Sequence, residues 1–191
     1  MVRKACFEAA RWSVPVRVAV NLSAVQFRRK GLTETVRKAL EDSGLPGDRL
    51  ELEVTESLLI DNRDDALRTL TALKQLGVRI AMDDFGTGYS SLSYLQSFPF
   101  DKIKIDRVFV SDLESGQQNA TIVRAVASMG KSLNMRVVAE GVETAAQARI
   151  LKDLDCDELQ GFLIAAPMPA SKVEEFLRTA TERKSAPLKV A

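Results

Sequence analysis

The stretch VRIAMDDFGTGYSS, residues 78–91, joins a short strand rich in β-branched residues to a pair of acids and a glycine-rich loop. Four other predicted strands also end in a carboxylate, an amide or a lysine. All strands of a parallel α/β barrel point the same way, so polar groups at their C-terminal ends meet at one mouth. The residues expected to meet there are Asn21 in AVNLS, Glu53 in LELEVTE, Asp83 and Asp84 in IAMDDFGTGYSS, Lys104 in KIKIDR and Glu140 in VVAEGVET.

Strands and helices alternate along the whole chain. The predicted strands are short, as strands covered by helices tend to be, and occupy residues 16–21, 50–55, 78–83, 102–106 and 136–141. Apolar residues at helical spacing predict helices near residues 33–43, 63–76, 118–134 and 143–153. Gly44 and Gly77 follow two of these helices as C-caps, and Thr144 is the expected N-cap of the last. We also expect a sixth short strand in DELQGF, residues 157–162, and a final helix after a loop in AAPMPASKVEEFLRT, residues 165–179.

This alternation is compatible with a closed α/β barrel and with an open doubly wound sheet. In a doubly wound sheet a few loops at the switch point serve the ligand, whereas here nearly every strand ends in a polar residue. We therefore predict a barrel. One domain is expected over residues 1–180, and the polar, aperiodic residues 181–191 are expected to form a disordered tail.

Composition excludes several classes of function. The 27 basic residues nearly cancel the 26 acidic ones, so no positive field attracts a nucleic acid polymer or an anionic membrane. Charged residues interrupt every apolar run, so no membrane segment is expected. The chain has no histidine, which excludes Ser-His and Cys-His nucleophile pairs and histidine-ligated zinc. Cys6 and Cys156 are expected to be reduced packing residues of a cytoplasmic protein.

Oxygen ligands remain available for catalysis. Hard divalent cations prefer carboxylate and amide oxygens, so the strand-end residues are candidate ligands for Mg²⁺ or Mn²⁺. We expect two ions, because so many acids would repel one another without cations, and an ion pair can activate water and neutralise a leaving phosphate oxygen. Asp83 is the expected bridging ligand. Lys104 is expected to orient the attacking water and to stabilise charge on the phosphate. The oxygen ligands and this lysine together suggest a metal-assisted phosphate ester hydrolase.

Each of these residues also has a plain structural interpretation. An Asp-Asp pair after a strand is often a turn or a helix N-cap, and Glu53 or Lys104 could pair with a neighbour or face solvent. The DFGTGYSS loop could cradle a phosphate, but it lacks the third glycine of the dinucleotide fingerprint, so a flexible lid is expected. Gln160 could hold substrate or make a loop hydrogen bond. The repeated placement of acids at strand ends favours the metal site.

The motifs NLS, EVTES, DDFGTGYSSL, KIKIDR, VVAEGVET and QGF, in this order and approximate spacing, resemble those of the EAL-type cyclic di-GMP phosphodiesterases of bacteria. The resemblance extends from the first helix to about Leu177. It implies a modified TIM barrel, two Mg²⁺ or Mn²⁺ ions, and hydrolysis of cyclic di-GMP to linear pGpG. It also implies a homodimer and an upstream sensory or GGDEF domain.

The resemblance further implies a role for each matching residue. By motif it assigns metal binding to Asn21, Glu53, Asp83, Asp84 and Glu140, catalysis to Lys104 and Glu140, anchoring of the DFGTGYSS loop to Glu56, and the substrate pocket to Asp106, Glu143 and Gln160. The same loop is implied to contribute to the dimer interface and to the second metal site.

One part of the family pattern is absent from this sequence. The family takes its name from a Glu-Ala-Leu motif on its first strand, and the chain starts downstream of it; Glu8-Ala9-Ala10 lies in a predicted helix and does not replace it. The expected fold is therefore a TIM-like (β/α) barrel of the EAL type that lacks its first strand and helix and has an open seam. Two functions stay open: a phosphodiesterase impaired by the missing motif, and a non-catalytic EAL-like fragment that binds nucleotide or dimerises as a regulatory module.

Overall fold

The computed structural model describes residues 1–56, 58, 62–86, 92–114 and 117–185. Within these residues six parallel strands form one sheet, whose order β1-β2-β3-β4-β5-β6 is the order of the chain. The strands are β1 (Val18–Leu22), β2 (Leu50–Thr55), β3 (Arg79–Phe85), β4 (Lys102–Ile105), β5 (Arg136–Ala139) and β6 (Glu158–Leu159). A doubly wound sheet would change direction at a switch point, whereas this sequential order is that of a barrel. The predicted barrel-type α/β fold is thereby confirmed.

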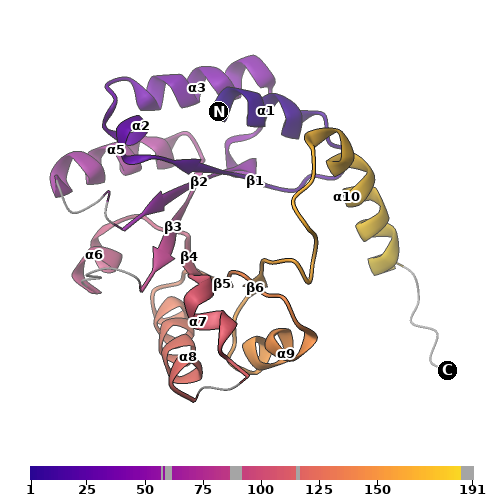
Figure 1. Ribbon diagram of the computed structural model, residues 1–191. Helices are drawn as coiled ribbons and strands as arrows, with labels where there is room; N and C mark the ends of the chain where they lie inside the picture. The colour runs from indigo at the N-terminus through magenta and orange to yellow at the C-terminus, as the bar shows by residue number, and fades with distance from the viewer. Residues whose placement is uncertain (57, 59–61, 87–91, 115–116, 186–191) are drawn as a thin grey trace.

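Helices surround the curled sheet, and most of them lie on its outer face (Figure 1). They are α1 (Val2–Ala10), α2 (Ala24–Arg28), α3 (Leu32–Ser43), α5 (Arg63–Gln75), α6 (Leu92–Ser97), α7 (Arg107–Ser111), α8 (Gln117–Ser132), α9 (Ala145–Asp153) and α10 (Ala170–Ser185), with a 3-10 turn, η1 (Gly47–Arg49), before β2. Helix α1 packs against α3, α3 packs against α5, and α8 packs against β4 and β5. None of the described helices has the length and hydrophobicity needed to cross a lipid bilayer.

The core lies between the sheet and this helical layer. Strand β2 alternates apolar and charged residues, and Leu50, Leu52 and Val54 are completely buried. Strand β4 does the same with Ile103 and Ile105. Because successive side chains of a strand point to opposite faces, the apolar half packs against the helices and the charged half points into the barrel. The hydrophobic pattern therefore fixes which strand residues reach the interior.

Local signals mark three of the predicted helix ends, whereas the short helices α2, α6 and α7 were not predicted. Thr144 caps α9, since its side chain accepts a hydrogen bond from the backbone of Gln147 in a capping box. Gly44 ends α3 with a φ of 68°, a left-handed conformation that glycine adopts without strain. Helix α5 has Leu76 as its C-cap, and Gly77 follows one residue later than predicted, with a φ of 82°.

The sheet has two free edges. Strands β1 and β6 are its outer strands, and neither has a second neighbouring strand among the described residues. A TIM barrel closes with eight strands, so this curled sheet is an incomplete barrel with an open seam, as the sequence predicts.

The C-terminal helix is longer than the sequence predicts. Helix α10 extends to Ser185 and so includes the first five residues of the expected tail, while residues 186–191 lie outside the described residues. It lies beside the segment that leads into β1 (Figure 1), where the hydroxyl and backbone N–H of Ser13 donate to the carboxylate of Glu174.

Candidate metal centre

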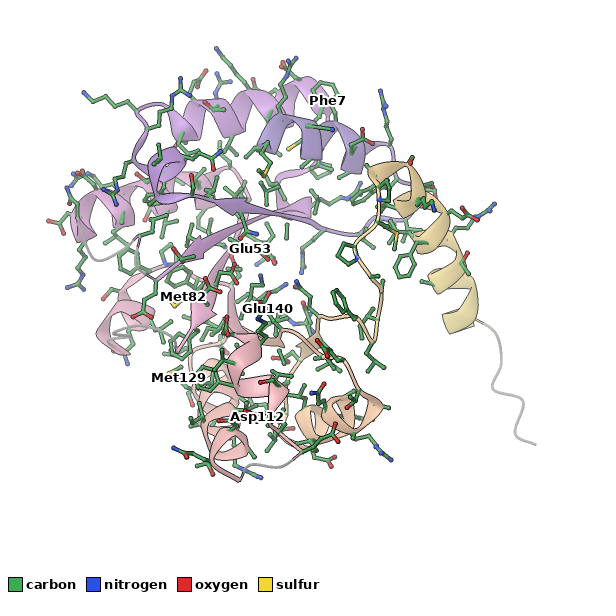
Figure 2. All side chains as sticks on the ribbon, in the orientation of Figure 1. Phe7, Glu53, Met82, Asp112, Met129 and Glu140 are labelled. Atoms are coloured by element: carbon green, nitrogen blue, oxygen red, sulfur yellow. The ribbon has the colours of Figure 1, made fainter. Side chains whose placement is uncertain are left out.

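Lys104 lies at the centre of the predicted site. Its Nζ atom is 2.9 Å from Glu53 Oε1, 2.9 Å from Asp83 Oδ1 and 2.6 Å from Glu140 Oε1. These acids come from β2, from β3 and from the residue after β5, and the ammonium is almost completely buried among them. Figure 2 shows Glu53 and Glu140 close to the same central space inside the curled sheet. The structure thus brings together acids that are far apart in the sequence, at one end of the barrel.

Asn21 completes this group from β1, where it pairs with Glu53 in the register of the sheet. With its nitrogen turned inward, the amide donates to Glu53 Oε2 at 3.1 Å and to Asp83 Oδ2 at 3.0 Å. With its oxygen turned inward instead, the amide joins the two carboxylates in an all-oxygen cluster. Such a cluster is the donor set that hard divalent cations prefer.

Asp84 reaches the site through a break in the strand pattern. Two consecutive residues of a regular strand point to opposite faces, so Asp83 and Asp84 could not both face inward. Asp84 has a φ of 57°, and the register between β3 and β4 shifts between Met82 and Phe85. This irregularity brings one carboxylate oxygen each of Asp83, Asp84 and Glu140 within 4.8 Å of one another.

The electrostatics of the site reflect a surplus of acids. Burial raises the pKa values of Glu53 and Glu140; Lys104 lowers them in part, and the negative charge of Asp83 raises them further. The pKa of Asp84 is raised by burial and by the charges of Asp83 and Asp106. Burial alone would lower the pKa of Lys104, but its hydrogen bond with Glu140 and the charge of Glu53 outweigh that effect, so the pKa is raised. Lys104 is therefore an ammonium at neutral pH.

These residues fit a divalent cation. Oxygens on opposite sides of such an ion lie about 4–5 Å apart, which matches the spacing of the Asp83, Asp84 and Glu140 oxygens. Asp83 Oδ1 is buried, and among the described residues it accepts no hydrogen bond of good geometry, although the charge of Lys104 is nearby. A cation would stabilise the ionised form of every carboxylate whose pKa burial raises.

A second layer of charges lies beneath the first and was not predicted from the sequence. Lys102 Nζ is 2.9 Å from Glu51 Oε1 and 2.9 Å from Glu158 Oε2, and Glu158 also pairs with Arg136 at 3.3 Å. The repeats LELE and KIKI carry the signal for this layer, because a two-residue period places Glu51 on the face of Glu53 and Lys102 on the face of Lys104.

Both layers open onto a cleft of about 680 Å³. Its lining includes Glu51, Glu53, Lys102, Lys104 and Gln160. Gln160 lies in the lining of this cleft, directly after β6, and its predicted contact with substrate stays a prediction.

Three other predicted residues lie around the mouth. Glu56 is buried just after β2, but Thr87–Ser91 of the loop that it is expected to anchor lie outside the described residues. Asp106 caps α7 by accepting a hydrogen bond from the backbone of Val108 at 2.8 Å. Glu143 lies between β5 and α9 with an exposed side chain. Their proposed roles in loop anchoring and substrate binding stay predictions.

Comparison with known proteins agrees with this geometry. A family model described as EAL domain matches residues 1–167. The solved PaMucR phosphodiesterase, in complex with c-di-GMP, is 45% identical, with a TM-score of 0.86 over 90% of this chain and 71% of that chain. The EAL domain of Mycobacterium smegmatis DcpA is 39% identical, with a TM-score of 0.88 over 93% of this chain and 82% of that chain.

Among curated sequences, the cyclic di-GMP phosphodiesterase NbdA of Pseudomonas aeruginosa is 46% identical over 163 residues, which are 85% of this chain and 21% of NbdA. The chain spans about a fifth of the length of the first curated relatives that it matches. The family match nevertheless covers residues 1–167, which is most of the chain and includes the residues of the candidate site. The chain therefore belongs to the EAL domain family.

Proposed function

We propose that this chain forms the metal-binding side of a phosphodiesterase site that hydrolyses cyclic di-GMP to linear pGpG. The observation that carries the proposal is the convergence of Glu53, Asp83 and Glu140 on one buried lysine, with Asn21 and Asp84 beside them. The names of similar proteins support the substrate, since NbdA of Pseudomonas aeruginosa and PdeR of Escherichia coli are described as cyclic di-GMP phosphodiesterases.

The metal ligands of the proposed site are Asn21, Glu53, Asp83, Asp84 and Glu140. Two Mg²⁺ or Mn²⁺ ions bound there would supply an activated water and a positive charge next to the phosphate. The chain's own contribution is to hold five oxygen donors on strand ends that the sheet makes rigid.

In the proposed reaction, the water oxygen forms a bond to phosphorus and the ester bond from phosphorus to the 3′ oxygen breaks. The leaving 3′ oxygen takes up a proton, which gives the linear dinucleotide. Lys104 Nζ has three protons, and its contact with Asp83 Oδ1 lacks good hydrogen-bond geometry, so one N–H can be donated to the attacking water or to a phosphate oxygen. Glu140 lies 2.6 Å from that ammonium and would therefore be close enough to the attacking water to accept its proton.

The experiment is a hydrolysis assay on the purified chain. Cyclic di-GMP is incubated with Mg²⁺ or Mn²⁺, and pGpG is measured by chromatography for wild type, Asp83→Asn and the matched control Asp153→Asn. Asp153 is exposed at the end of α9, so the control should keep wild-type activity. We expect metal-dependent pGpG formation that Asp83→Asn reduces at least 100-fold, since Asp83 is the expected bridging ligand. Equal rates for both variants would contradict the proposed role of Asp83.

A second candidate function is nucleotide binding without turnover. The observation that favours it is the open seam, because the outer strands β1 and β6 leave the barrel incomplete among the described residues. A folded chain that binds Mn²⁺ and cyclic di-GMP by calorimetry but forms no pGpG would support this module. The homodimer, the upstream sensory or GGDEF domain and the cytoplasmic location that the family resemblance implies stay predictions.

A further inference from the structure

We propose that Arg107 and Phe109 of α7 are positioning residues for the metal site, which set the spacing of two loops: the one that follows Asp83–Asp84 at the end of β3 and the one that carries Glu140 after β5. The inference rests on the proposed metal-dependent function. It concerns side chains that do not ligate the metal and that none of the sequence motifs assigns to the site.

The short helix α7 packs directly on the backbone of both loops. Gly86 follows the Asp83–Asp84 pair, and a Cβ atom at Gly86 would lie 2.8 Å from Phe109 Cε2 and 3.1 Å from Phe109 Cζ. Gly141 follows Glu140, and a Cβ atom there would lie 2.5 Å from Arg107 Cβ and 3.3 Å from Arg107 Cα. The shortest of these distances, 2.8 Å at Gly86 and 2.5 Å at Gly141, are too short for a Cβ atom, so α7 is in direct contact with each loop just beyond its acids.

The helix is also tied to the site at its N-terminus. Asp106 caps α7 through the backbone N–H of Val108, and its negative charge is near enough to Asp84 to contribute to the raised pKa of that carboxyl group. Lys104, two residues earlier on β4, contacts Asp83 and Glu140. Within residues 104–109, Lys104 thus contacts the acids Asp83 and Glu140 through charge. Arg107 and Phe109 contact the loops beyond these acids through packing.

The conformation of the loops explains why such support is needed. Gly86 and Gly141 have φ values of 97° and 69°, so the backbone adopts a left-handed conformation two residues after Asp84 and one residue after Glu140. Glycine loses the most conformational freedom on folding and has no side chain to anchor the turn, so the packing against α7 restrains it instead. Metal sites tolerate little displacement of their ligands, and loss of an outer support typically weakens metal affinity by about 10–100-fold.

Two pairs of variants test the proposal on the full chain. Phe109→Ala removes the ring that packs on Gly86, whereas Val108→Ala shortens an exposed side chain of the same helix. Arg107→Gly removes the Cβ atom that packs on Gly141, whereas Arg107→Ala keeps it. The readouts are the Mn²⁺ dissociation constant by calorimetry, the melting temperature without metal, and hydrogen exchange of the segments that end β3 and β5.

We expect Phe109→Ala and Arg107→Gly to weaken Mn²⁺ binding by about 10-fold or more, and their controls to stay within about 2-fold of wild type. Exchange should rise around Gly86 in Phe109→Ala and around Gly141 in Arg107→Gly. A change in melting temperature with unchanged Mn²⁺ affinity and unchanged local exchange would overturn the proposal, because α7 would then be ordinary packing.

The exchange readout also separates this inference from the proposed function. Were the wild-type chain to bind no Mn²⁺, the metal-dependent function would fail, while site-specific exchange changes would still decide whether α7 holds the two loops. If Phe109→Ala does not fold, the comparison of Arg107→Gly with Arg107→Ala tests the proposal alone. Both of these variants are expected to fold, since Arg107 has an exposed side chain.

Discussion

Lys104 stabilises a group of residues that would otherwise repel one another. A buried ammonium without partners is costly, and so are buried carboxylates without a cation, but here one ammonium lies within 2.9 Å of three carboxylates. Lys104 thus has a structural role in addition to its proposed catalytic one.

Replacing this lysine should therefore destabilise the chain. Lys104→Met leaves Glu53, Asp83 and Glu140 without their cation, and we expect a loss of about 3–5 kcal/mol in the free energy of unfolding at pH 7 without metal. Urea denaturation measures it. Lys131→Met, which breaks an exposed pair with Asp155, is the matched control and should change stability little. Similar losses for the two variants would contradict the role of Lys104.

The raised pKa values of the acids predict an unusual pH dependence. Burial raises the pKa of Glu140, so above the ordinary carboxyl range this residue holds its proton more tightly in the native chain than in the unfolded chain. Its contribution to stability is therefore complete at low pH and falls as pH rises from about 4 through the raised pKa. Lys104 does not titrate in that range, since its pKa is raised, and its contribution is lost only in alkali. Asp101 has a lowered pKa despite its burial, because Lys74 and the backbone N–H of Ile80 donate hydrogen bonds to it. Its pH dependence is the opposite of that of Glu140: its contribution to stability is lost as the pH falls.

A single variant isolates the Glu140 contribution. Glu140→Gln has no such titration, so its stability relative to wild type should increase between pH 5 and pH 7.5 in metal-free buffer. Urea denaturation at both pH values measures the offset, and Glu175→Gln, an exposed site on α10, should show a constant offset. An offset for Glu140→Gln that decreases with pH would show that its pKa is not raised.

At the level of helices and strands, the alternation of residues predicts much of the fold and of the site. The pattern LELEV identifies β2 and puts Glu53 on its inner face, and KIKI does the same for Lys104 in β4. The inward position of Asp84 could not be derived this way, because it depends on a left-handed residue and a register shift that two-residue alternation does not contain. The length of α10 was underestimated, since polar residues without an apolar period give no signal for a helix.

The cap of α9 gives a prediction at this level. Thr144 Oγ1 accepts from Gln147 N at 3.0 Å, and Gln147 Oε1 accepts from Thr144 N at 3.0 Å and from Glu143 N at 2.8 Å. Thr144→Ala should lower the free energy of unfolding by about 1 kcal/mol, as loss of an N-cap usually does, and Thr144→Ser should restore most of it. Urea denaturation of the three proteins is the measurement; an unchanged midpoint for Thr144→Ala would show that the cap contributes nothing.

For the whole molecule, the number of neighbouring strands differs from strand to strand, and we expect local unfolding to begin at the strands with one neighbour. Strand β3 lies between two strands of the sheet, whereas β6 has two residues and one neighbour among the described residues. The sequence predicts six strands and a barrel, but it does not reveal that β6 has two residues, because its length depends on pairing with β5.

Hydrogen exchange followed by mass spectrometry should therefore show a gradient. We expect the slowest exchange in β2, β3 and β4, which have strand neighbours on both sides, and faster exchange in β6 and on the outer edge of β1. Protection in β6 equal to that in β3 would mean that another segment pairs with this edge in solution.

The cleft along the seam has one more consequence, which concerns dissolved salt. It borders both charge layers, so salt ions that enter the cleft come near the lysine–glutamate pairs, although Lys102 and Lys104 themselves are buried. Counterions that enter this way weaken the attraction between lysines and glutamates, which closed protein interiors shield from salt. Although the chain has almost no net charge, its free energy of unfolding should therefore fall as ionic strength rises, because the ion pairs inside the barrel weaken.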